Sequence, residues 1–158
     1  MKQRKSWKEK LTDSKDLPKI LDIPDRLQAK WGTGNFVIPA PVEVDELMRR
    51  VPKGKLTTIN HVRMALAKKH DTTVACPLTT GIFAWIAANA AEEDASENRK
   101  KRITPYWRTL KAGGVLNEKY PGGAVAQKKR LLAEGHKIAK KGKKQVVTDI
   151  EKSLFDFD

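Results

Sequence analysis

The sequence predicts a mostly α-helical domain with a small β wing and an N-terminal arm. Apolar residues recur at helical spacing through the centre of the chain, and prolines and glycines interrupt them at short intervals. Near the end, short apolar runs flank a lysine-rich turn. A chain of 158 residues fits one domain with appended segments. We expect the arm over residues 1–40, the domain over 41–148 and an acidic tail over 149–158.

The N-terminal arm is expected to pack along the domain. Trp7 and Leu11 are its candidate anchors. Pro18 and Pro24 interrupt the apolar residues that follow, so any helix there is short. Residues 36–38 are apolar and predict an extended stretch. The arm opens with a basic group that comprises Lys2, Arg4, Lys5, Lys8 and Lys10.

Two helices are predicted in the first half of the domain. Apolar side chains share one face over residues 42–50, and a proline and a glycine then break that helix. Thr57 or Thr58 can cap a second helix, which continues to about residue 67. Residues 70–73 supply a turn.

A third helix, rich in alanine, follows that turn. Pro77 suits the first turn of a helix, and Cys76 lies near its cap. The helix is expected to reach Ala91, after which residues 92–102 form a solvated charged loop that includes Arg99, Lys100 and Lys101. Two helices joined by a short turn form the outline of a helix-turn-helix.

One more helix and a hairpin are predicted in the last part of the domain. Residues 124–134 form the helix, with Leu131 and Leu132 facing inward. Apolar runs on both sides of a lysine- and glycine-containing turn in residues 136–147 predict a β-hairpin, which would be the wing. The acidic tail is either loose or packed by its apolar residues.

Composition favours a nucleic-acid partner. The chain has 32 Lys and Arg against 19 Asp and Glu, a formal charge of +13, and such an excess attracts polyanions. A basic surface without a specific partner is the alternative. Cys76 is the one cysteine and the histidines are dispersed, so no disulfide, metal site or cofactor is expected. The chain shows no signal peptide and no membrane-spanning run, which predicts a cytoplasmic protein without membrane contact.

An ordered series of short motifs runs through the domain. The series comprises Val51-Pro52-Lys53-Gly54-Lys55-Leu56-Thr57-Thr58, the small-residue helix over 79–91, Pro105-Tyr106-Trp107-Arg108, Gly113-Gly114, Tyr120-Pro121-Gly122-Gly123 and residues 129–136. In this order the motifs resemble the C-terminal winged helix-turn-helix domain of the O6-alkylguanine-DNA alkyltransferases, also called methylated-DNA–protein cysteine methyltransferases. The family's N-terminal ribonuclease-H-like domain has no counterpart in residues 1–40.

The resemblance implies a chemistry that this chain lacks. Members of the family bind DNA in the minor groove, flip an alkylated guanine into a pocket and transfer its alkyl group to the cysteine of a Pro-Cys-His-Arg motif. Here Tyr106 stands at the cysteine position and Trp107 at the histidine position, while Glu134 keeps the place of a glutamate with nothing left to orient. A phenol with an ordinary pKa of about 10 is not a soft nucleophile at neutral pH, so transfer at this site is excluded.

The replaced cysteine resembles that of the alkyltransferase-like proteins, which bind the lesion without transfer. The resemblance then implies a base pocket formed by Tyr106, Trp107, Arg108, Tyr120, Gly122, Gly123 and Glu134. Arg108 is expected to bond backbone carbonyls and hold the pocket loop. The three aromatic rings either form a cage for an extruded base or simply fill a vacated site.

The implied DNA contacts each have a simpler alternative. Phe83, at the position of the family's arginine finger, either stacks into the duplex or belongs to the core. The hydroxyls at the start of the third helix either hold DNA phosphates or only cap the helix. Asn89 either contacts a groove edge or faces water. The lysines either bind the phosphate backbone of DNA or form a solvated face. The candidate set is Thr57, Thr58, Ile59, Thr79, Thr80, Phe83, Asn89, Lys128, Lys129 and Arg130, with the lysines of 137–144 beside it.

Three functional hypotheses follow. The first is a non-catalytic, monomeric alkyltransferase-like protein that recognises alkylated or modified guanine in duplex DNA by base flipping and hands it to a DNA-repair protein. The second is an active alkyltransferase that uses Cys76, whose place at a helix N-terminus would lower the pKa of its thiol; a packed or capping role for Cys76 is the alternative. The third is a lesion-independent DNA- or protein-interaction module.

Overall fold

The computed structural model describes residues 5–97 and 102–158. Lys2 and Arg4 of the basic opening, and Arg99, Lys100 and Lys101 of the predicted loop, lie outside the described residues. Within the part of the chain that is described, no helix has the length and apolar character needed to span a bilayer.

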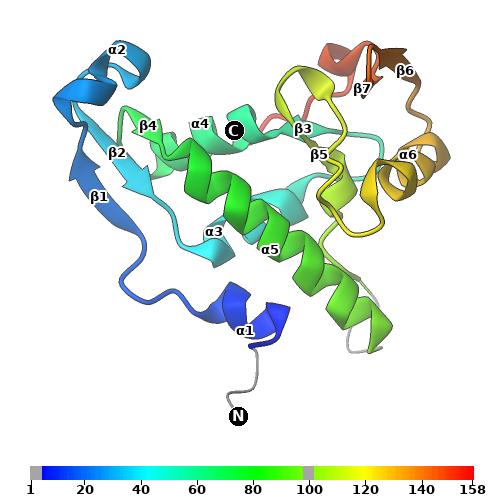
Figure 1. Ribbon diagram of the computed structural model, residues 1–158, viewed down its shortest axis with the longest axis horizontal. Coiled ribbons are helices and arrows are strands. Elements are labelled where there is room, and N and C mark those ends of the chain that lie inside the picture. Colours follow the sequence, from blue (N-terminus) through cyan, green and yellow to red (C-terminus); the bar gives the residue numbers. More distant parts are fainter. Residues whose placement is uncertain (1–4, 98–101) are drawn as a thin grey trace.

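The elements confirm a mostly helical domain with a small β wing (Figure 1). The helices are α1 (Trp7–Thr12), α2 (Gln28–Trp31), α3 (Pro41–Arg50), α4 (Ile59–His70), α5 (Pro77–Ser96) and α6 (Gly123–Ala133). The strands are β1 (Lys19–Asp22), β2 (Asn35–Ile38), β3 (Thr57–Thr58), β4 (Val74–Ala75), β5 (Thr109–Leu110), β6 (Ile138–Lys141) and β7 (Lys144–Val147). Short 3-10 turns lie at Asp25–Leu27, Tyr106–Arg108, Ala112–Gly114 and Ile150–Lys152.

The first two predicted helices are confirmed as α3 and α4, and local signals fix their ends. The Glu43 carboxylate accepts a hydrogen bond from the Ala40 N–H at 2.8 Å, which satisfies a free amide at the start of α3. Thr58 caps α4 through its side chain, which accepts from the N–H of His61. Asp71 ends α4 in the left-handed conformation, with φ of 54°.

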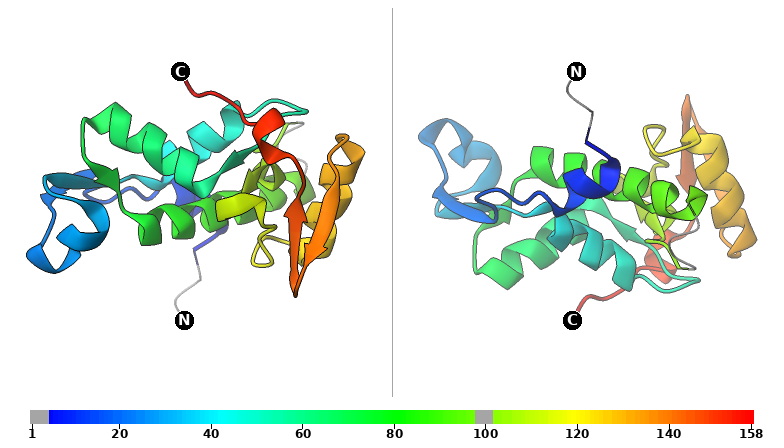
Figure 2. Two further views of the ribbon diagram at one scale, coloured as in Figure 1. Left: turned by 90° about the horizontal axis from the view of Figure 1, so that it is seen from above. Right: turned by 90° about the horizontal axis from the view of Figure 1, so that it is seen from below.

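Helix α5 lies at the centre of the molecule. Pro77 occupies its first turn and Cys76 its cap, as predicted. Its alanines at 84, 87, 88 and 91 are buried, and these small side chains let α3 and α1 pack against it. The hairpin of β1 and β2 with α2 lies toward one end of the molecule, and α6 with the β6–β7 wing lies toward the other (Figures 1 and 2).

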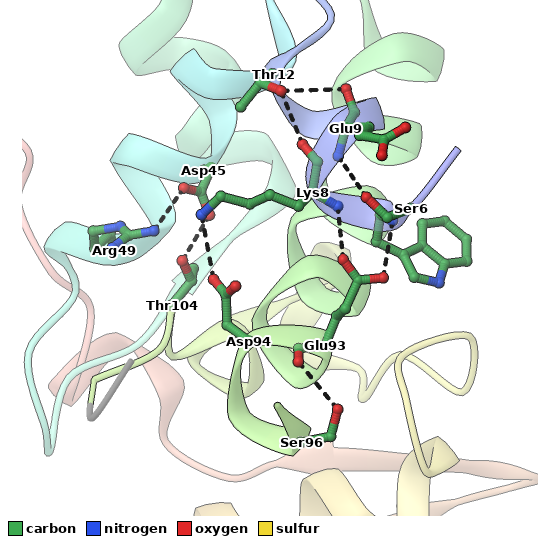
Figure 3. Close-up of polar contacts among 11 residues, drawn as sticks. Ser6, Lys8, Glu9, Thr12, Asp45, Arg49, Glu93, Asp94, Ser96 and Thr104 are labelled. Carbon is green, nitrogen blue, oxygen red and sulfur yellow. Dashed lines mark hydrogen bonds and ion pairs between the residues drawn. The ribbon is translucent and has the colours of Figure 1, made fainter. Parts of the chain in front are cut away.

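The prediction of a loop from residue 92 is wrong, because α5 continues to Ser96. Its charged last turns bind α1 (Figure 3). The Glu93 carboxylate accepts from the backbone N–H groups of Trp7 and Lys8 at 3.1 and 3.2 Å, and Lys8 pairs with Asp94 at 3.4 Å. Acidic residues that sequence reasoning assigned to solvent are therefore the attachment points of the arm.

The arm also joins the domain through a sheet. Strand β1 pairs antiparallel with β2, and β2 pairs parallel with β4, which connects α4 to α5. The extended stretch over 36–38 is confirmed as part of β2, whereas β1 occupies the region where at most a short helix was expected. The anchors are confirmed as well, since Leu11 is buried and Trp7 packs edge-to-face on Trp85 at 4.8 Å.

The remaining strands form two small two-stranded sheets. Strand β3 pairs parallel with β5, and the predicted hairpin is confirmed as β6–β7. Leu131 is buried, but Leu132 is 49% exposed and not inward, because adjacent residues of a helix face different directions. The tail is packed: Leu56 exchanges backbone hydrogen bonds of 2.8 Å with Ser153 and Phe155.

Candidate functional site

Tyr106 is the first residue of the 3-10 turn Tyr106–Arg108, which follows α5 in the chain. Its side chain is 2% exposed, and its hydroxyl donates to the Glu92 carboxylate at 2.7 Å. Burial first, and then the hydrogen bond and charge of Glu92, raise the pKa of Tyr106 well above its ordinary value. The phenol is therefore a protonated hydrogen-bond donor at neutral pH.

Three rings form an aromatic cluster (Tyr106, Trp107, Tyr120). The Tyr106 ring meets those of Trp107 and Tyr120 edge-to-face, each at a centroid distance of 5.3 Å. Tyr120 is 2% exposed and its hydroxyl donates to the Thr109 carbonyl at 3.0 Å. The Tyr106 ring touches both of the others, so a base could enter beside it only by parting these rings.

Arg108 and Glu134 form an ion pair beside the aromatic cluster. The Arg108 guanidinium donates to the Glu134 carboxylate at 2.7 and 2.9 Å, and the Trp107 indole N–H donates to it at 3.1 Å. Burial opposes ionisation of Glu134, but these hydrogen bonds hold its pKa below the usual range. Arg108 also donates to the Val51 carbonyl at 2.8 Å, so its predicted contact with the backbone is confirmed. The expectation that Glu134 has nothing to orient is wrong.

Two residues of this site were missed in the sequence. Gln127 is 1% exposed; its amide donates to the Trp107 carbonyl at 3.1 Å and accepts from the Asn117 N–H at 2.7 Å. Glu92 accepts from both Tyr106 and Arg130. A glutamine within a basic helix is a weak sign of burial. Nothing in the sequence indicated a role for Glu92, because its segment was predicted to be a loop.

Gly122 and Gly123 connect the aromatic cluster to α6. Gly122 has φ of 80°, and a Cβ atom there would lie 2.5 Å from the Cβ atom of Ala126. A side chain at Gly122 would clash as well as strain the backbone. The two glycines lie where the loop that carries Tyr120 turns into the helix.

The outer face of α5 (Leu78, Ile82, Trp85) is apolar and open. These residues follow one another at spacings of four and three and therefore share one side of the helix. Their exposed fractions are 71%, 43% and 37%. Together with Ile59 of α4 they line a hollow of about 450 Å³, and Lys111, Asn117 and Lys119 form its other wall.

The predicted DNA-contacting residues at the helix starts are mostly inside the protein. Ile59 lines the hollow on the outer face of α5. Thr57 and Thr58 are buried, and Thr80 is buried with its hydroxyl donating to the Cys76 carbonyl at 2.6 Å. The Thr79 hydroxyl is buried and has no hydrogen-bond partner among the described residues.

Phe83 and Asn89 lie elsewhere on α5. Phe83 is partly buried against the core and lines a pocket with Leu17 and Pro41, away from Ile59. The Asn89 amide donates to the Trp85 carbonyl of its own helix at 2.9 Å.

The predicted basic residues divide into two groups. Lys129 and the lysines of residues 137–144 are exposed, and Lys128 is half-buried. Arg130 instead covers the Trp107 ring at 4.1 Å and pairs with Glu92 at 3.2 Å. The structure therefore joins Arg130 to the aromatic cluster. Cys76, half-buried, caps α5.

No protein-family model matches the chain, and no curated protein matches it. Two solved structures do. The first is Atl1 of S. pombe in complex with damaged DNA containing O6-carboxymethylguanine, at 14% identity and a TM-score of 0.48, with 73% of this chain and 94% of that chain covered. The second is the S. pombe protein ATL in complex with DNA, at 16% identity and a TM-score of 0.53, with the same coverage. The second likeness establishes a shared fold.

Proposed function

We propose that the chain is an alkyltransferase-like DNA-binding protein that recognises alkylated guanine without transferring the alkyl group. The observation that carries the proposal is the outer face of α5 (Leu78, Ile82, Trp85), which exposes three large apolar side chains on the helix that we interpret as the second of a helix-turn-helix. The proposed role in DNA repair follows from the kind of base that is recognised.

An apolar stripe on this helix suits the minor groove. Apolar side chains of minor-groove proteins enter between base steps and unstack them. In the proposed complex Leu78 and Ile82 take that role, and Phe83, which packs on the core, does not. Lys111 and Lys119 on the opposite wall of the hollow would meet phosphates, which makes binding sensitive to salt.

The hollow beside Trp85 is the proposed place for an extruded base. Its lining is mainly apolar, with Asn117 and two lysines as the polar members. A flipped base gains stacking on an aromatic face and hydrogen bonds along its edge. The aromatic cluster lies deeper in the protein, so this proposal places the base outside Tyr106 rather than between the three rings.

The shared fold supports this assignment. The S. pombe protein ATL, at a TM-score of 0.53, was crystallised with DNA. The formal charge of +13 gives the chain the long-range attraction for a polyanion that such a role needs.

The proposed absence of transfer rests on the chemistry of Tyr106. A thiolate is the nucleophile for an alkyl carbon, and a buried phenol with a raised pKa that donates to Glu92 does not replace it. Cys76 caps α5 with its backbone carbonyl held by the Thr80 hydroxyl, which supports a structural role for Cys76 over the alternative of an active thiol.

A second candidate, a DNA-binding module that ignores lesions, has one observation in its favour. The Tyr106 ring already contacts both other rings of the aromatic cluster, so the deep site offers no selectivity for an extruded base unless the rings part. In that case, lesion recognition depends only on the hollow at the outer face of α5.

The test is a comparison of two duplexes that differ only in one central O6-methylguanine, at several fixed salt concentrations, with intact-protein mass recorded on the same samples. We expect tighter binding to the modified duplex and an unchanged protein mass. Equal affinity with salt-dependent binding would leave the lesion-independent module. A mass increase by one methyl group, lost in Cys76→Ser, would establish the enzyme.

A further inference from the structure

A second hollow lies away from the outer face of α5 and is lined by cations. It measures about 1030 Å³. We call it the basic hollow; its cationic members are Arg49, Arg50, Lys53, Arg102, Arg108 and Arg130. No carboxylate from the described part of the chain is among its lining residues.

Three of these cations are already paired. Arg49 binds Asp45 at 3.0 Å, as Figure 3 shows, while Arg108 and Arg130 bind Glu134 and Glu92. Their carboxylate partners lie outside the lining of the hollow. The paired side chains are therefore held in place and add donors without adding much net charge.

The other three cations carry unbalanced charge. The Arg50 guanidinium donates to the Phe157 carbonyl at 2.8 Å, which positions it without neutralising it. Within residues 5–97 and 102–158, neither Lys53 nor Arg102 has an ion-pair partner. Like charges gathered in one concavity repel one another and attract an anion from solution.

We propose that the basic hollow binds the phosphodiester backbone of a nucleic acid, as a contact separate from the outer face of α5. Guanidinium groups bind phosphate oxygens in a two-pronged geometry, and this hollow gathers several of them. Its volume is at the upper end of the range for sites of small molecules, which is larger than a single phosphate needs. Adjacent phosphates of one strand fit both its size and its charge.

The two contacts are separated along α5. Ala95 lines the basic hollow, whereas Ile82 lines the hollow on the outer face of α5. The two hollows share no lining residue. Ala95 lies thirteen residues after Ile82, about 20 Å along a helix. The backbone that enters the basic hollow therefore belongs to DNA about six base pairs away on the same duplex, or to a second molecule.

The preference for a phosphodiester over an acidic polypeptide rests on the proposed function. Both ligands offer anionic oxygens to the same arginines. A chain that holds DNA at the outer face of α5 brings phosphates within reach of the basic hollow at high local concentration, which raises the effective affinity of a second contact without new interactions.

The experiment uses two charge-matched double variants of the full chain. Lys53→Gln with Arg102→Gln removes two of the three cations that carry unbalanced charge in the hollow, and Arg26→Gln with Lys30→Gln removes one arginine and one lysine from the exposed region near α2, at the other end of the molecule (Figure 1). Affinities for duplexes of about 10 and about 30 base pairs are measured over a range of salt concentrations. Two fluorescently labelled short duplexes are also mixed with the protein. Energy transfer between their labels reports whether one protein bridges two duplexes.

For the Lys53/Arg102 variant we expect about tenfold weaker binding of the long duplex and a salt slope smaller by about 1 to 2, while the Arg26/Lys30 variant changes little. A loss confined to the long duplex assigns the hollow to the same duplex, and a loss of energy transfer assigns it to a second molecule. Equal behaviour of the two double variants overturns the proposal. The proposal is also overturned if the Lys53/Arg102 substitutions displace a fluorescent poly-glutamate peptide from the hollow while the affinity for DNA stays unchanged.

The same measurements distinguish this inference from the proposed function. Leu78→Ala with Ile82→Ala serves as the third variant. If it weakens binding while the Lys53/Arg102 variant does not, the basic hollow is refuted and the outer face of α5 stands. The reverse result refutes the outer face of α5 and retains the basic hollow.

Discussion

The outer face of α5 and the aromatic cluster are neighbouring regions with opposite character. The first leaves Leu78, Ile82 and Trp85 open to solvent, with fractional exposures from 37% to 71%. In the second, Tyr106 and Tyr120 are 2% exposed, and hydrogen bonds hold both hydroxyls. Tyr106, at the position that resembles an alkyltransferase nucleophile, is thus part of the core, whereas α5 exposes an apolar face in which Trp85 also packs on Trp7 of α1.

The difference shows that one fold can combine a closed aromatic interior with an open apolar surface. Aromatic side chains at positions 106 and 107 bury large areas and satisfy their polar atoms locally. Exposed apolar side chains contribute little to folding, and a contiguous group of them is typical of a contact surface. Stability and binding should therefore respond to different substitutions.

The largest effect is expected from Glu134→Ala, which disrupts the ion pair beside the aromatic cluster. The substitution leaves the Arg108 guanidinium and the Trp107 N–H without their acceptor in a largely buried site. We expect the free energy of unfolding to fall by about 3 kcal/mol, as measured by urea denaturation. Glu118→Ala, at an exposed position, is the control and should change it by no more than about 0.5 kcal/mol. Similar values for both variants would mean that the ion pair does not hold the cluster.

An intermediate effect, on binding alone, is expected from Leu78→Ala with Ile82→Ala. Both side chains are exposed, so the thermal midpoint should stay nearly unchanged. Affinity for duplex DNA should fall about tenfold, because the apolar contact with a base step is lost. The matched control is Val125→Ala with Leu132→Ala on α6, a pair at least as open to solvent as Leu78 and Ile82. A fall in affinity of the same size in the control would remove the special role of the outer face of α5.

The smallest effect is a pH dependence carried by His136. Its Nε2 atom is buried without a partner among the described residues, and burial lowers its pKa from 6.5, with Arg108 adding to the shift and Glu134 opposing it. The unfolded chain thus binds a proton more readily than the folded one, so stability falls as the pH drops below about 6.5. Urea denaturation between about pH 7.5 and 5.5 should show a shallow decline that His136→Leu flattens. An unchanged decline in His136→Leu would assign the titration to another group.

Elements with local signals were predictable from the sequence. Pro41 and Pro77 at helix starts, the Thr58 cap and the lysine-rich hairpin turn all fix structure within a few residues. Such signals do not depend on distant parts of the chain, which is why α3, α4, the start of α5 and the wing lie where the pattern placed them.

Features that depend on distant partners were not predictable. The end of α5 is held by α1, and Glu93 appeared solvent-facing because its partners at Trp7 and Lys8 are remote in sequence. Strand β1 forms because β2 is available to pair with it. The buried face of an alanine-rich helix is equally hard to predict, since small residues fit on any side of it. Phe83 packs inward, whereas Ile82 faces outward. The assignments to base and DNA contact remain predictions.

The attachment of α1 to the end of α5 also bears on how the chain is made. The hydrogen bond between Trp7 and Glu93 spans 86 residues, and that from Lys8 to Asp94 spans as many. During synthesis from the N-terminus, α1 leaves the ribosome long before its binding site exists, and a helix of 6 residues does not persist alone in water. Its docking is therefore a late, non-local event with the loop-closure cost of a long separation. A segment that is translated before the rest of the domain is thus among the last parts of it to acquire structure.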